Sequence, residues 1–425
     1  LIPLLSDSAL EDTYLRFSAA RGGPTFLDRS ELKAVAPALD EASIWLLGSQ
    51  RVKPYLDSPA QVFDLNSRAF PNGGYFVMHQ GQGAAAAYLV FDCGPFGYKP
   101  VPSHGHADAL SFELHAHGQT WIVDPGIYST HLGDDWRNFF RGSRAHNTVV
   151  VDRQDQSVLM DIWRVYRPAQ ASLHHWFASD HFDFVDGSHD GYERLQEPVS
   201  HRRQIFFAKP EYWVIVDSLT GQGQHCFETY FHLMPGLETQ LERESGTLQV
   251  SNGSGSGLMI APLAPHLWQP EVIIGATAPI QGWVSFFSGE KQPAPTLRYH
   301  QEAVAPLQFC TVLYPYQGSK QQVQLSIAPL MVEVQGRSSA KSELTGLRLE
   351  TATHVDYLVI DRGGAGARKT FGAFETDAQL SYIRCQKEDQ QPVKVVVRGG
   401  SQLLFEGRSL LEASQNKGLI VDAGS

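Results

Sequence analysis

Cysteine is scarce in this sequence and follows no recognisable pattern. The four cysteines, at positions 93, 226, 310 and 385, lie far apart and form no CxxC pair. This spacing supports neither a thiolate metal site nor a disulfide framework. We therefore expect the cysteines to be small buried apolar residues, and they leave the cellular compartment open.

Long apolar runs are also missing. No run approaches the roughly 20 apolar residues that a membrane-spanning helix requires, so we expect no membrane span. The first nine residues lack the basic flank of a signal peptide. Because the chain begins at Leu1 and not at methionine, we expect it to be the C-terminal part of a longer protein, in which case the missing leader says nothing about export.

Positive charge is in short supply, with 34 lysines and arginines against 45 aspartates and glutamates and a formal net charge of −11. This balance disfavours a general polyanion-binding surface, so we expect no nucleic-acid partner. The GxSxG, HExxH, P-loop and dinucleotide-binding motifs are absent as well. The sequence therefore gives no indication of the hydrolases, phosphotransferases and oxidoreductases that these motifs identify.

The remaining composition is that of a globular protein, with 42% apolar and 11% aromatic residues. At 425 residues the chain exceeds a single core, at roughly 100 to 200 residues per domain. Many short strand patterns follow residue 74 without long helices between them, which favours a mainly β fold built on a large antiparallel β-sandwich. We predict helices at residues 1–57, the sandwich at 58–335 and a small C-terminal β-domain at 336–425.

One stretch, residues 103–147, holds six of the 17 histidines together with several arginines. His104 and His106 are two residues apart, so in an extended strand both would face the same way. Asp124 follows a short apolar run and precedes a Pro-Gly pair that ends strands. Histidine and aspartate side chains suit zinc and related divalent ions, so we predict one divalent metal, zinc, held by His106, Asp124 and His146.

Two observations count against this site. A HisxHis pair is often only a pair of hydrogen-bonded surface histidines, and an aspartate before Pro-Gly is often a turn residue. If Gly118 closes a tight hairpin, simple alternation also puts Asp124 on the wrong face. A bulge or bend near residues 105–108 is then required.

A local basic patch lies in the same stretch, at Arg137, Arg141 and Arg144. Guanidinium groups can hold a carboxylate through two hydrogen bonds, which fits an acidic sugar. The alternative is that these arginines form structural ion pairs with acids such as Asp134 and Asp135.

Three segments in this order resemble the heparinase II/III-like polysaccharide lyases, a family that includes oligoalginate lyases. They are His104-Gly105-His106-Ala107-Asp108, Val123-Asp124-Pro125-Gly126 and Arg144-Ala145-His146-Asn147-Thr148. The resemblance implies a helical (α/α) toroid followed by large antiparallel sheets. It also places metal ligands at His106, Asp124 and His146, and an active-site histidine at His104. The toroid, with its catalytic tyrosine and its asparagine or histidine, is almost entirely absent from this chain, so residues 1–57 would be its last helices.

From this resemblance we predict a lyase that cleaves a uronate-containing polysaccharide by β-elimination. His104 would exchange the proton at C5 of the uronate, and Tyr128 would donate a proton to the leaving oxygen. Arg141, Arg144 and Asn147 would bind the substrate and offset its carboxylate charge. The resemblance further implies a periplasmic or secreted protein.

Other functions stay open. A non-catalytic acidic-glycan-binding sandwich, a uronate C5-epimerase and a purely structural domain each fit the same residues. The sequence does not choose among heparinoid, alginate and other acidic glycans, between endo and exo action, or among oligomeric states, and it leaves the role of the metal open.

Overall fold

The computed structural model describes most of the chain from residue 44 onward. The described residues are 44–45, 48–57, 65–97, 102–129, 134–161, 163–318, 323–335, 343–363, 366–412 and 419–422. The helices predicted before residue 44 lie outside this part; within residues 44–57 the described helical residues are 44–45 and helix α3 (Ser49–Asp57). None of the described helices has the length and apolarity to cross a bilayer.

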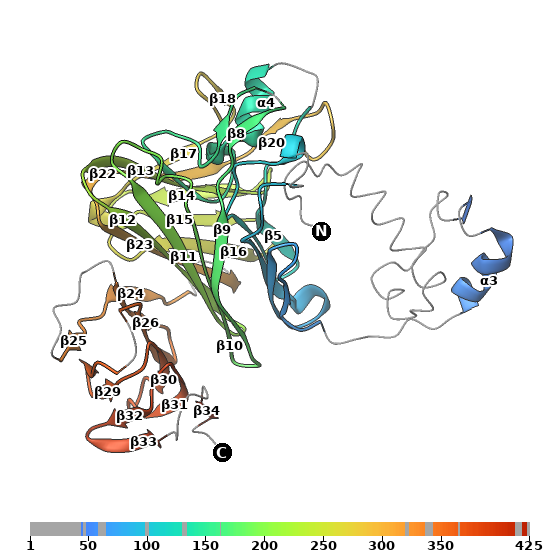
Figure 1. Cartoon of the computed structure of the whole chain (residues 1–425). Coiled ribbons are helices and arrows are strands. Elements are labelled where there is room, and N and C mark those ends of the chain that lie inside the picture. The colour runs from blue at the N-terminus through green and yellow to red at the C-terminus, as the bar shows by residue number, and fades with distance from the viewer. Residues whose placement is uncertain are drawn as a thin grey trace.

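The largest unit is an eight-stranded antiparallel sheet, whose strands β9 to β12 are drawn in green in Figure 1. Its spatial order is β14 (Glu238–Glu242), β15 (Thr247–Ser251), β16 (Ser256–Pro262), β23 (Leu307–Gln317), β12 (Tyr212–Gly221), β11 (Val199–Ala208), β10 (Phe182–His189) and β9 (Ala171–Ala178).

A second layer packs on the inner face of this sheet. It consists of a five-stranded sheet, β1 (Arg68–Phe70), β2 (Tyr75–Gln80), β3 (Ala87–Asp92), β4 (Phe112–Ala116) and β5 (Gln119–Ile122), and a four-stranded sheet, β17 (Gln269–Ile273), β22 (Thr296–Val304), β13 (Gln224–His232) and β6 (Val149–Val151). A bridge between Ile122 and Leu233 joins the two sheets. One hydrophobic core lies between the layers, which confirms the predicted sandwich.

The C-terminal strands form two further sheets, drawn in orange and red in Figure 1. The first contains β24 (Ser326–Pro329), β26 (Leu344–Glu350), β27 (His354–Asp361), β30 (Leu380–Gln386), β31 (Pro392–Arg398) and β34 (Leu419–Asp422); the second contains β25 (Glu333–Val334), β28 (Lys369–Phe371), β29 (Phe374–Thr376), β32 (Gln402–Phe405) and β33 (Arg408–Glu412). Strands β24 and β25 precede residue 336 yet pair with these sheets.

The remaining elements are short helices and two-stranded pairs. They are the helix α4 (Asp134–Arg141), the 3-10 turns η2 (Gly83–Ala85), η3 (Pro102–His104), η4 (Ser143–Ala145) and η5 (Pro265–Leu267), and the two-stranded pairs β7 (Val158–Leu159) with β8 (Val165–Arg167), β18 (Ala276–Thr277) with β19 (Ile280–Gln281), and β20 (Trp283–Val284) with β21 (Gln292–Pro293).

The central strands of the eight-stranded sheet, β10, β11, β12 and β23, are buried on both faces, and their sequences reflect this. Strand β12 begins Tyr212-Trp213-Val214-Ile215-Val216 with no polar alternation, as expected for a strand covered on both sides. Trp213 and Ile215 face the sandwich core, whereas Tyr212, Val214 and Val216 face a second core shared with the C-terminal sheet. The six-stranded C-terminal sheet, called the C-terminal sheet below, is therefore packed on the outer face of the sandwich.

Two sequence expectations were wrong in this region. Residues 102–104 form a 3-10 turn and residues 105–111 form no strand, so His104 and His106 do not share a strand face. Helix α4 was missed, because its pattern of tryptophan, arginine and phenylalanine was interpreted only as a basic patch. A register shift at Leu114/His115 in the β4–β5 hairpin supplies a bulge, although outside the expected span of 105–108.

Phe206 tests the packing of the C-terminal sheet on the sandwich. Its ring lies 5.1 Å from that of Tyr382 and 5.7 Å from that of Phe182, and its side chain is fully buried. We expect Phe206→Ala to lower the free energy of unfolding by about 3–5 kcal/mol in urea denaturation. As a control, Phe287→Ala, at a side chain that is 46% exposed, should change it by less than about 0.5 kcal/mol. A small effect at Phe206 would contradict this packing.

Candidate functional site

The loop between β3 and β4 carries His104 and His106 into different environments. His104 ends the turn η3 and is exposed, whereas His106 is 1% exposed. Gly105 between them lies against Phe96, where an added Cβ would come within 2.5 Å of the ring. Close packing on Phe96 thus explains why the residue between the two histidines has no side chain.

Helix α4 and the turn after it hold this loop in place. Arg141 is fully buried; its Nε donates to the carbonyl of Gly105 at 3.2 Å and its Nη1 to that of Asp161 at 2.9 Å. The Ala107 N–H donates in turn to the carbonyl of Arg141, and Ser143 Oγ donates to the carbonyl of Ala107. Arg141 therefore positions the histidine loop, and its role in binding substrate stays a prediction.

Three buried side chains converge beneath the loop. Potential ligand atoms of His106, Asp108 and His146 all lie within 4.8 Å of one another. Tetrahedral coordination at about 2.1 Å sets ligand atoms roughly 3.4 Å apart, so a small inward adjustment would let the three share one ion. This set differs from the predicted one in a single member, since Asp108 stands where Asp124 was expected.

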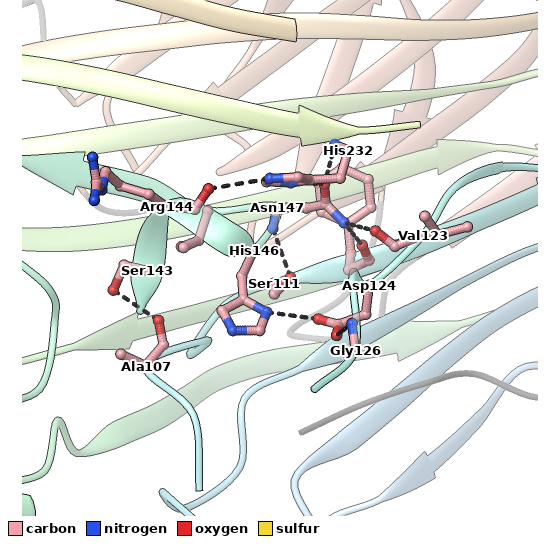
Figure 2. Close-up of polar contacts among 12 residues, drawn as sticks. Ala107, Ser111, Val123, Asp124, Gly126, Ser143, Arg144, His146, Asn147 and His232 are labelled. Carbon is pink, nitrogen blue, oxygen red and sulfur yellow. Dashed lines mark hydrogen bonds and ion pairs between the residues drawn. The ribbon is translucent and has the colours of Figure 1, made fainter. Parts of the chain in front are cut away.

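Asp124 instead orients His146, as Figure 2 shows. Its Oδ2 accepts a hydrogen bond from His146 Nδ1 at 2.7 Å, and its Oδ1 accepts one from the Gly126 N–H at 2.9 Å. His146 Nε2 is buried and has no hydrogen-bond partner among the described residues. A carboxylate on one ring nitrogen, with the other nitrogen turned to a cluster of ligands, is the usual arrangement of a metal-binding histidine.

The electrostatics of this cluster also fit a cation. Burial, and then the neighbouring charges of Asp108 and Asp124, raise the pKa of Asp92 well above its usual value. Burial would lower the pKa of His146, but Asp124 and its hydrogen bond raise it to about 9. The carboxyl groups thus draw a positive charge into the site. Binding of a metal there remains a prediction.

Asn147 joins the two inner sheets through its side-chain amide. Its Nδ2 donates to the carbonyls of Phe112 and Val123, both at 2.8 Å, and its Oδ1 accepts the His232 N–H (Figure 2). The residue is fully buried. Both polar groups of its side chain are thus engaged with protein, and contact of Asn147 with a substrate stays a prediction.

Arg203 lies under the same segments and was not identified from the sequence as part of the site. Its guanidinium pairs with Asp217 at 2.7 Å and 3.0 Å, and its Nη1 donates to the carbonyls of Leu110 and Asn147. The Arg203 hydrogen bonds and ion pair, together with His201, lower the pKa of Asp217 to about 2 despite its burial. The signal in the sequence was an arginine within a strand of otherwise mostly apolar residues, which indicates a buried ion pair.

Arg144 and Tyr128 remain near solvent. The half-buried Arg144 side chain lines a cavity of about 400 Å³ together with Asp135, Asn138, Arg153 and Asp155. Tyr128 is half-buried, and its ring lies 5.9 Å from that of Trp136 and 4.0 Å from Lys291 Nζ. Of the three predicted substrate-binding residues, Arg144 lines this cavity, whereas Arg141 and Asn147 are fully buried.

The sequence signals for the two missed acids were weak. Asp108 stands two residues after His106 in the quoted motif, and Asp92 ends a predicted strand. The fold brings both to the imidazoles, because the Leu110 N–H donates to the Asp92 carbonyl and so holds the loop against the end of β3.

Comparisons with known proteins show which family and fold this chain shares. Residues 64–327 match the family described as heparinase II/III-like, C-terminal. A heparin-sulfate lyase of Bacteroides stercoris is 24% identical over 204 residues, 47% of this chain and 28% of that protein. A heparin-sulfate lyase of Bacteroides thetaiotaomicron is 20% identical over 264 residues, 59% of this chain and 34% of that protein. This chain thus spans about a third of these relatives.

Solved structures share the fold. Heparan sulfate lyase HepC from Pedobacter heparinus superposes with a TM-score of 0.65 at 17% identity, over 85% of this chain and 50% of that one. A heparinase III structure gives the same values. The family match spans more than half of the 425 residues and contains all three motif segments. This chain therefore belongs to the heparinase II/III-like family.

Proposed function

We propose that this chain is the β-sheet portion of a lyase that cleaves a uronate-containing acidic polysaccharide by β-elimination. The observation that carries the proposal is the exposed His104 beside the buried cluster of His106, Asp108 and His146. The names of the relatives, heparin-sulfate lyases, support heparan-type glycans as the first substrates to test. We place the protein in the periplasm or outside the cell, where a polymeric substrate is encountered.

The reaction removes the proton at C5, next to the uronate carboxylate, and expels the oxygen at C4 to leave an unsaturated sugar. His104 is exposed at the end of η3 and removes the C5 proton, a general-base role in which histidine is the most frequent side chain. Arg144 holds the carboxylate of the sugar from the adjoining cavity and so offsets the charge that develops on it. Tyr128 donates the proton that the C4 oxygen requires.

His106, Asp108 and His146 would hold a divalent ion, and two imidazoles with one carboxylate favour zinc. Its contribution when bound is to tie the loop after β3 to the segment after α4 and to add positive charge beside the substrate carboxylate. Asp124 keeps His146 Nδ1 protonated, so that Nε2 faces the ligand cluster.

A non-catalytic glycan-binding sandwich is the second candidate. It is favoured by the engagement of Arg141 and Asn147 in the fold, which leaves fewer side chains for substrate than the sequence predicts. The two functions differ in whether an unsaturated product is formed.

The proposed activity is tested on a panel of heparan sulfate, alginate and other acidic polysaccharides, using the 425-residue chain and any longer form that its gene encodes. We expect ultraviolet absorbance from an unsaturated uronate to rise with at least one of them. His104→Ala should reduce this rate ~10²-fold or more, because a proton-transfer group is lost. His354→Ala, in the C-terminal sheet, is the matched control and should keep the rate.

Binding of a glycan without any rise in absorbance would instead support the non-catalytic function. An inverted C5 centre in an uncleaved product would identify an epimerase.

The metal proposal makes a separate prediction about two aspartates. We expect elemental analysis to find about one divalent ion per chain, lost in Asp108→Ala and in His106→Ala. Asp124→Asn should weaken metal affinity only ~10- to 100-fold, because it acts through His146. The exposed Asp161→Asn serves as the control. If Asp108→Ala keeps the metal while Asp124→Ala loses it, Asp124 is the ligand, as the sequence predicted.

A further inference from the structure

A second cavity, of about 230 Å³, lies on the outer face of the eight-stranded sheet, against the C-terminal sheet. Strands β9, β10 and β11 contribute Phe177, Asp186 and Arg202, and the C-terminal sheet contributes Arg362 and Arg398. At about 30 Å³ for each water, this volume holds a small anion or part of one sugar ring. Nothing in the lyase mechanism uses this cavity.

The charge of the cavity lining is positive. Arginines 202, 362 and 398 face aspartates 186 and 361. The acids are already engaged: Asp186 accepts two hydrogen bonds from Arg202, both at 2.6 Å, and one from Gln204 at 2.8 Å. Asp361 pairs with the buried Lys369 at 3.1 Å. Arg398 therefore adds positive charge that these two carboxylates do not balance.

Arg398 is the most informative of the three arginines. Its guanidinium carbon lies 3.3 Å from the ring centroid of Phe177, and no hydrogen bond or ion pair of this side chain is found among the described residues. Its Nε is buried. Burial lowers the pKa of Arg398, and burial together with Arg202 lowers that of Arg362. Arg398 is half-buried, and a buried guanidinium N–H without an acceptor carries a desolvation cost that a bound anion would offset.

We propose that this cavity binds an oxyanion, the sulfate or carboxylate group that acidic sugars carry. The planar guanidinium of Arg398 offers paired N–H donors that match such a group, and Phe177 fixes its plane. Arg362 supplies a second cation at the same cavity.

This site is separate from the metal cluster, because alternate residues of a strand face opposite sides of a sheet. Arg202 and Asp186 face the outer cavity, whereas their neighbours Arg203 and Gly187 face inward. Arg203 holds the carbonyl of Leu110, and an added Cβ on Gly187 would meet the Leu110 side chain at 3.1 Å. The oxyanion site therefore does not rest on the proposed lyase activity.

Isothermal titration of the 425-residue chain with inorganic sulfate and with glucuronate tests the site. We expect one binding site per chain, and Arg398→Gln should weaken it about tenfold or more. Arg398→Lys, which keeps the charge without the planar donors, should give an intermediate affinity. Arg348→Gln is the control, since Arg348 lies in the same sheet but pairs with Glu350 outside the cavity. Unchanged melting temperatures should show that the variants are folded.

Tighter binding of glucuronate than of sulfate would support the site and identify a saccharide as the source of the group. Binding of sulfate alone would support the site with a free anion as its ligand. Asp108→Ala, which alters the metal cluster, should bind the anion as the unchanged protein does. Failure of the lyase or metal proposal would therefore not affect the test of the oxyanion site. Absence of binding by both anions, or equal affinity in Arg398→Gln, would overturn the proposal.

Discussion

The buried guanidinium of Arg203 is the interaction on which the arrangement of the site depends. It pairs with Asp217 on the neighbouring strand and donates to the carbonyls of Leu110 and Asn147, which follow the two histidine motifs in separate parts of the chain. A buried charge must be matched on all sides, and breaking such a pair typically costs about 3–5 kcal/mol. One cation thus fixes two loops against the sheet that carries it.

The surroundings of Arg203 explain how the charge is tolerated. The Gly191 N–H donates to His189 Nδ1, so His189 Nε2 donates to His201 Nδ1, and His201 Nε2 donates to Asp217. This series of hydrogen bonds requires both imidazoles to be neutral. Burial lowers the pKa of His189 and of His201, which favours the neutral form. The positive charge therefore stays on Arg203. Arg203 also holds the backbone of Leu110 through its hydrogen bond to the Leu110 carbonyl. Leu110 has a left-handed backbone conformation, with φ 64°, that is unusual for a branched side chain.

The sequence was sufficient for the architecture and for most of the residues of the cluster. Alternating and continuous apolar runs predicted the β-sandwich, and the motif segments predicted His106 and His146 as neighbours. The sequence could not identify the carboxylate that lies beside the two histidines. The choice between Asp108 and Asp124 depends on the turn of the loop at Leu110 and on the hydrogen bond between Asp124 and His146 Nδ1. The roles of Arg141 and Asn147 in holding backbone carbonyls were beyond the sequence for a related reason: a polar residue in a motif can bind the backbone or a ligand, and the sequence does not show burial.

Burial on both faces gives the central sheet two roles, since its inner side chains support the histidine cluster while its outer ones line the oxyanion cavity. Hydrogen exchange on Arg203→Lys tests the dependence on Arg203 most directly, because lysine keeps the charge but lacks the planar set of donors. We predict faster exchange at the amides of residues 110–111 and 147–148 together, with protection of the amides in β11 and β12 retained. Unchanged protection at these two segments would contradict the account.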